Sequence, residues 1–162
     1  IEHARGLLVD RLSAAADLAA DHRVRLAFEP LHPMVCGFRS VVSSLGEALD
    51  ILDQLDDGHD IGLAIDAYAL WWEHDLAAKL MRAGDRILNY HVSDWLSDTR
   101  DLRLDRGMPG DGQIALRDWR RMIEAAGYLG PVELEIFSRD RWWKTPAKSM
   151  TAVILERMNA CF

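Results

Sequence analysis

The feature that most constrains this chain is a regular alternation of strand-like and helix-like segments, in which four strands are each followed by a helix. Strands are predicted at 24–29, 61–66, 86–93 and 131–137, and helices at 2–21, 44–55, 75–83, 115–126 and 146–160. The strands are short apolar runs, and the helices carry apolar residues at helical spacing. Such alternation predicts parallel strands joined by right-handed crossovers, which leaves a doubly wound sheet and a closed barrel open.

The polarity of the two faces of the predicted strands distinguishes between these folds. Side chains alternate across a strand, so each face can be read from every second residue. One face is apolar and consists of Leu26, Phe28, Leu63, Ile65, Leu88, Tyr90, Val92, Val132, Leu134 and Ile136. The other face mixes small and polar residues, whereas a sheet covered by helices on both sides should be apolar on both faces. The sequence therefore predicts an α/β fold of the (β/α)8 TIM-barrel type, with the apolar face against the helices and the polar face inside the barrel.

The polar face ends, at the last inward position of each strand, in a side chain that can bind a metal ion. These four residues are Glu29, Asp66, His91 and Glu135. Burying unpaired carboxylates is costly, so a cation that neutralises them explains why they converge at one end of the barrel. Three carboxylates and one imidazole suit Mn²⁺, Mg²⁺, Co²⁺ or Zn²⁺. The alternative, four ordinary polar residues at strand ends, is disfavoured because all four are in phase.

Five segments of the chain resemble the sugar phosphate isomerase/epimerase family, whose fold is the xylose isomerase-like TIM barrel. They are LAFEPLHP, GLAIDAYALWW, ILNYHVSDWL, RGMPGDGQI and GYLGPVELEIFS. The resemblance implies that Glu29, Asp66, His91 and Glu135 bind one divalent metal ion, with Mn²⁺ expected before Mg²⁺, Co²⁺ or Zn²⁺. The Ile-Phe-Ser that follows Glu135 favours this residue over Glu133 as the ligand.

The resemblance also implies residues that contact the substrate. Arg106 begins a loop with the sequence RGMPGDG and is expected to hold substrate oxygens, the alternative being a surface arginine. His32 and Trp71 are further candidates for the pocket, with plain packing as their alternative. Ala69 stands where many relatives have a substrate-contacting histidine, which weakens the inference to activity but not to metal binding. Asp94 either orients a ligand or caps a turn.

The chain is short for a complete barrel of this type, which needs roughly 250 residues. We therefore expect residues 1–162 to be the C-terminal part of a single xylose isomerase-like barrel domain and a piece of a longer protein. The alternatives are that two chains pair into one barrel, which would make a homo-oligomer, or that upstream residues are missing from the structure.

Charge and composition bear on partners and location. The net charge of −7 argues against nucleic acid as the main partner, since an acidic protein repels phosphates. No apolar run approaches the roughly 18 residues of a membrane helix, so no membrane partner is expected. The two isolated cysteines, Cys36 and Cys161, fit a reducing cytoplasm. The acidic stretch 50–60 is interpreted as a solvated helix end.

By resemblance, the chain belongs to an enzyme that isomerises or epimerises a ketose, a sugar phosphate or a related keto-polyol. Glu29 and Glu135 would flank this small-molecule substrate, one removing the α-proton and the other returning it to an enediolate. A lyase of the same superfamily that dehydrates its substrate shares the first step, so the sequence leaves both reactions open. A non-catalytic barrel that keeps the metal site is a third alternative. A DNA-repair endonuclease is disfavoured by the negative charge and the single clear histidine ligand.

Overall fold

The computed structural model describes residues 1–55 and 60–162, and its centre is a four-stranded parallel sheet. The strands are β1 (Leu26–Phe28), β2 (Ile61–Asp66), β3 (Ile87–Val92) and β4 (Val132–Leu134), and they lie side by side in chain order. Strand order in a doubly wound sheet reverses at a switch point, whereas order along a barrel wall follows the chain. The sheet is therefore part of a barrel wall, as predicted. Residues 56–59 of the acidic stretch 50–60 lie outside the described residues.

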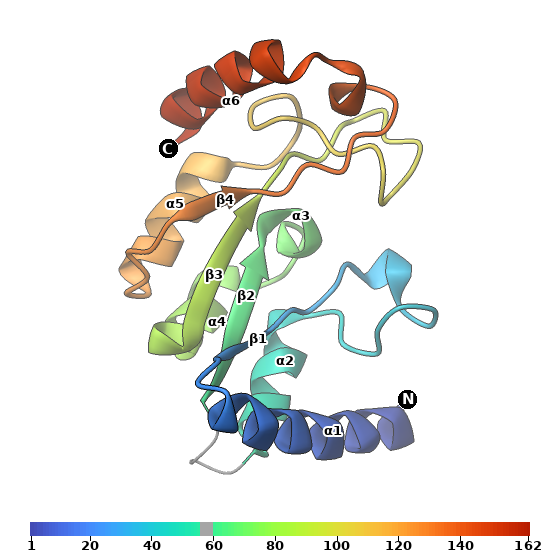
Figure 1. The fold of residues 1–162 in the computed structure, drawn as a ribbon, viewed down its shortest axis with the longest axis vertical. Coiled ribbons are helices and arrows are strands. Elements are labelled where there is room, and N and C mark those ends of the chain that lie inside the picture. The colour runs from blue at the N-terminus through green and yellow to red at the C-terminus, as the bar shows by residue number, and fades with distance from the viewer. Residues whose placement is uncertain (56–59) are drawn as a thin grey trace.

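Helices cover one face of the sheet and both ends of the molecule (Figure 1). α2 (Leu45–Leu52), α4 (Leu76–Ala83) and α5 (Leu116–Ala125) are neighbours outside the sheet, and α1 (Glu2–Asp21) packs against α2. α6 (Ala147–Cys161) lies at the opposite end from α1. The shorter helical turns are η1 (Pro33–Val35), α3 (Ala67–Leu70), η2 (Gly84–Arg86) and η3 (Trp142–Lys144). No helix in the described ranges combines the length and the apolar character needed to cross a bilayer.

The hydrophobic core lies between the sheet and these outer helices. Leu63 and Ile65 of β2 and Tyr90 and Val92 of β3 are fully buried and pack with apolar residues of the helices, among them Leu49, Leu80 and Ile123. The apolar strand face therefore meets the helices, as the alternation of side chains predicts. The polar face is left for the barrel interior.

One strand residue, Leu88, departs from the predicted alternation. Leu63 pairs with Ile87 but Ala64 pairs with Asn89, so β3 contains one extra residue at this point. Ile87 takes the buried position against the helices, while Leu88 lies against Gly62, where an added Cβ would come within 2.4 Å of the Leu88 Cγ. The prediction that Leu88 faces the helices is wrong, because a bulge moves the extra side chain to the other face.

The start of α2 is fixed by two side-chain acceptors. Ser44 Oγ accepts the Glu47 backbone N–H at 3.1 Å, as is typical of a serine at the N-cap position. The buried Glu73 carboxylate, which follows α3, accepts the N–H groups of Leu45 at 2.8 Å and Gly46 at 3.3 Å. A carboxylate at a helix N-terminus also interacts favourably with the helix dipole. This second cap ties the helix to the loop beyond β2.

Candidate active site

The four predicted ligands lie together at the C-terminal edge of the sheet. Asp66 is the last residue of β2 and pairs in register with His91 of β3. Glu29 follows β1 directly, and Glu135 follows β4, where its backbone N–H donates to the Val92 carbonyl at 3.0 Å. β1 and β4 are shorter than predicted, so the two glutamates stand just beyond the strands. In this position their carboxylates lie beside His91 at the mouth of the barrel.

Three of the four residues form a cluster that fits a divalent metal ion. Glu29, His91 and Glu135 are half-buried, and each offers a ligand atom within 4.8 Å of the ligand atoms of the other two. His91 Nδ1 is buried and has no hydrogen-bond partner within residues 1–55 and 60–162. A buried nitrogen without a partner is costly unless something binds it. Two carboxylates and one imidazole are donors that Mn²⁺, Co²⁺ and Zn²⁺ accept.

Asp66, the fourth predicted ligand, is fully buried and is engaged by other groups. Its Oδ1 accepts the Tyr68 backbone N–H at 2.9 Å, which makes it the cap of α3. Its Oδ2 accepts a hydrogen bond from Arg106 Nη1 at 2.8 Å. Asp66 therefore lies at the site but outside the cluster of Glu29, His91 and Glu135, and its role as a ligand stays a prediction.

Arg106 lies inside the site, in contact with two of the predicted ligands. Besides Asp66, its Nη1 donates to Glu135 Oε2 at 3.0 Å and to Ser93 Oγ at 3.3 Å. The Cζ of the guanidinium lies 4.3 Å from the centroid of the Tyr68 ring, and only 12% of the side chain is exposed. The alternative of a solvated surface arginine does not describe this geometry. Its role toward substrate oxygens stays a prediction.

Burial and mutual repulsion change how the carboxyl groups bind protons. The pKa of Glu29 is raised to about 7, first by burial and then by the charges of Asp66 and Glu135, with Arg106 and Arg39 opposing the rise. Burial also raises the pKa of Asp66, which the Arg106 charge opposes. A carboxyl group that titrates near neutrality is suited to taking up and releasing a proton during catalysis.

The loop that begins with Arg106 is held by Asp94, just beyond β3. The fully buried Asp94 carboxylate accepts four backbone N–H groups at 2.9 to 3.0 Å, from Trp95, Gly110, Gly112 and Ile114. The backbone groups of Asp94 and Gly107 also exchange two hydrogen bonds, both of 2.9 Å. Of the two roles considered for Asp94, the structure shows the turn cap. A carboxylate with four N–H partners fixes the loop that carries Arg106.

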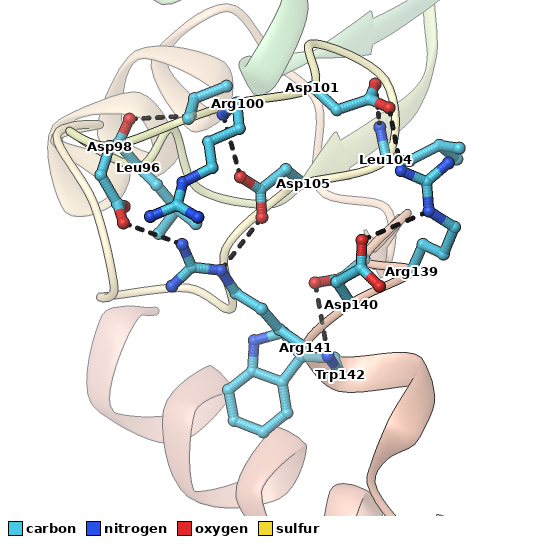
Figure 2. A network of polar contacts seen from close by, with 12 residues as sticks. Leu96, Asp98, Arg100, Asp101, Leu104, Asp105, Arg139, Asp140, Arg141 and Trp142 are labelled. Carbon is cyan, nitrogen blue, oxygen red and sulfur yellow. Dashed lines mark hydrogen bonds and ion pairs between the residues drawn. The ribbon is translucent and has the colours of Figure 1, made fainter.

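The preceding part of the same loop is held from the other side by the segment after β4. Figure 2 shows Arg141 between two aspartates, with its Nε 3.0 Å from Asp105 Oδ1 and its Nη2 3.0 Å from Asp98 Oδ2. Asp105 also accepts the Arg100 backbone N–H at 3.0 Å. Next to this network, the Arg106 backbone N–H donates to the Phe137 carbonyl at 2.9 Å. The backbone of Arg106 is therefore fixed from two directions.

The two other predicted substrate residues, His32 and Trp71, meet in an aromatic cluster around Trp95. The His32 ring stacks on Trp95 with a centroid distance of 4.8 Å, and Trp71 lies 5.7 Å from the same ring. Tyr68 contacts Trp95 at 4.9 Å, and its hydroxyl donates to the Leu102 carbonyl at 3.0 Å. Tyr68 and Trp95 were not among the residues predicted from the sequence to form the site. Both stand within two residues of a polar strand-end residue, Asp66 or Asp94, which is the signal that identifies them.

Residues 1–156 match the family model of the xylose isomerase-like TIM barrel. The chain belongs to this family. The predicted family and fold class are thereby confirmed. Among curated proteins, no sequence matches the chain. Protein SMc04130 from Sinorhizobium meliloti is similar in structure, with a TM-score of 0.94 and 47% sequence identity over 99% of this chain and 58% of that protein.

More distant members of this fold include enzymes and a zinc-bound protein. The IolI protein with a bound zinc atom has a TM-score of 0.75 and 21% identity over 95% of this chain and 56% of that one. The 3-keto-D-glucoside 4-epimerase YcjR from E. coli has a TM-score of 0.69 and 21% identity over 96% of this chain and 53% of that one. At these identities the likeness shows the fold alone. This xylose isomerase-like chain spans little more than half of each of these proteins.

Proposed function

We propose that this chain is the metal-binding, C-terminal part of a single barrel domain that isomerises or epimerises a ketose, a sugar phosphate or a related keto-polyol. The observation that carries the proposal is the convergence of Glu29, His91 and Glu135 at the C-terminal edge of the sheet, with Arg106 beside them. Active sites of TIM-barrel enzymes lie at this edge. The epimerase among the structures of the same fold supports the reaction class.

Glu29, His91 and Glu135 would hold one divalent ion, Mn²⁺ by preference, and Asp66 would complete the set. Bound there, the ion would supply Lewis-acid polarisation of a substrate carbonyl. The fit rests on His91 Nδ1, which has no hydrogen-bond partner among the described residues, and on carboxylates whose mutual repulsion a cation would relieve. The zinc-bound structure of the same fold supports a divalent ion in general rather than a particular metal.

The protein groups would carry the proton chemistry. Glu29 would take the α-proton of the substrate, and Glu135 would return a proton on the other side. Arg106 would bind a hydroxyl or phosphate oxygen, because a guanidinium offers several donors in a fixed plane. The aromatic cluster of His32, Trp71 and Trp95 would form one wall of the pocket. The proposed location is the cytoplasm, and the proposed partner is a small sugar.

The test is proton exchange at the substrate α-carbon, measured by NMR in D₂O with Mn²⁺ and a panel of ketoses and ketose phosphates. The wild-type protein should exchange the α-proton of at least one of them. Glu29→Gln and Glu135→Gln should lower the rate by about 100-fold or more, the usual size of a general acid–base contribution. Glu124→Gln, on the exposed face of α5, is the matched control. Unchanged exchange in Glu29→Gln would refute the assignment.

A further inference from the structure

Arg106 contacts the site in a way that resembles a bound cation. A single nitrogen, Nη1, lies 2.8 Å from Asp66 Oδ2 and 3.0 Å from Glu135 Oε2, and so bridges carboxylates from two strands. Ser93 Oγ, which is also buried, lies 3.3 Å from the same nitrogen. A divalent ion held by Glu29, His91 and Glu135 would also draw on the Glu135 carboxylate.

Electrostatics make the two cations competitors. Asp66 is fully buried, and a buried carboxylate without a partner is strongly destabilising. In this structure Arg106 supplies the compensating charge. A divalent ion bound to the same carboxylates would stand close to the guanidinium, and like charges at such separations repel strongly in a site of low dielectric. A divalent ion held by Glu29, His91 and Glu135 would therefore weaken the hold of the Glu135 carboxylate on Arg106.

Two aromatic rings flank the Arg106 guanidinium in its present position. Its guanidinium lies over the Tyr68 ring at 4.3 Å and over the Phe137 ring at 5.2 Å, and aromatic faces stabilise cations. Its Nε is buried and has no hydrogen-bond partner in the part of the chain that the structure describes. Because hydrogen bonds fix the backbone of Arg106 and Gly107, a displacement of the guanidinium would be a movement of the side chain alone.

We propose that Arg106 is the counter-ion of Asp66 and Glu135 in the metal-free site, and that metal binding displaces it into its substrate-binding position. The inference rests on the proposed function and deepens it. It makes metal binding and substrate binding cooperative, because the ion that occupies the carboxylates also releases the donor for a substrate hydroxyl or phosphate. Metal would then bind before substrate.

The test is the affinity of the purified protein for Mn²⁺ alone, measured by titration calorimetry without substrate. Arg106→Gln should bind Mn²⁺ at least about tenfold more tightly than the wild type, because the competitor is gone. Arg106→Lys should lie between the two, since the charge remains but the reach is shorter. Arg121→Gln, which removes the same charge from the exposed face of α5, is the control and should match the wild type.

Chemical rescue separates competition from a general disturbance of the site. Free guanidinium at concentrations that do not denature the protein should weaken Mn²⁺ binding to Arg106→Gln and leave the wild type nearly unchanged. If both Arg106 variants bind Mn²⁺ as tightly as the wild type or more weakly, Arg106 does not compete with the metal ion, although the metal site itself would stand. Absence of Mn²⁺ binding by the wild-type protein would overturn both the proposed function and the displacement of Arg106 by the metal ion. If Arg106→Gln does not fold, Arg106→Lys alone decides the outcome.

Discussion

Replacing Glu29 by glutamine tests the electrostatics of the site with almost no change in volume. In the metal-free protein, burial and neighbouring carboxylates raise the pKa of Glu29 from 4.5 to about 7. A carboxyl group with a raised pKa in the folded state stabilises the protein fully below its unfolded pKa, and this contribution is lost as pH rises through the folded pKa. One pKa unit corresponds to about 1.4 kcal/mol, so the full rise amounts to about 3 kcal/mol as an upper bound.

Glu29→Gln removes this pH-dependent term. The free energy of unfolding should therefore be similar in the two proteins near pH 4.5, and the variant should become the more stable one by about 1 to 3 kcal/mol at pH 8. The assay is urea unfolding across this pH range, with a chelator present to remove metal ions. Glu124→Gln serves as the reference for the loss of one exposed negative charge. A Glu29→Gln variant that is less stable than the wild type at pH 8, or a stability difference that does not change with pH, would contradict a raised pKa of Glu29.

Three further substitutions test the support of the site, each by chemical denaturation. Asp94→Asn should destabilise the protein by about 3 kcal/mol, because an amide oxygen cannot accept four N–H groups and at least two lose their partner. Gly112→Ala should cost at least about 2 kcal/mol, since its Cβ would lie 2.2 Å from the Trp95 carbonyl oxygen. Glu73→Gln should cost about 1 kcal/mol through the weakened cap of α2. Unchanged unfolding midpoints would contradict each prediction.

The fold was largely predictable because its signals are local. β2 was predicted at 61–66 and is found there, since a short apolar run between turn residues is enough to define a buried parallel strand. The bulge at Leu88 was not predictable in this way. It arises from how β3 pairs with β2, and pairing between strands leaves no mark on the alternation within one strand.

The candidate site was predictable where it depends only on which residues of each strand point to the same face of the sheet. The phase of the strands placed Glu29, His91 and Glu135 at one edge, and the structure brings these three together. It could not show that Asp66 is paired with Arg106, because the two residues are 40 positions apart and meet only through a long loop. The loop itself depends on the Asp94 carboxylate, whose role as a turn cap or a ligand-orienting group remained open until its backbone partners were known.

The central claim is that Glu29, His91 and Glu135 hold one divalent metal ion. The most direct test is metal analysis and Mn²⁺ titration of the purified protein, with His91→Ala and Glu135→Gln beside the Glu124→Gln control. We expect one ion per chain in the wild type and the control, and a loss of about two orders of magnitude in affinity in both site variants. No bound ion in the wild-type protein, or an unchanged affinity in His91→Ala, would contradict it.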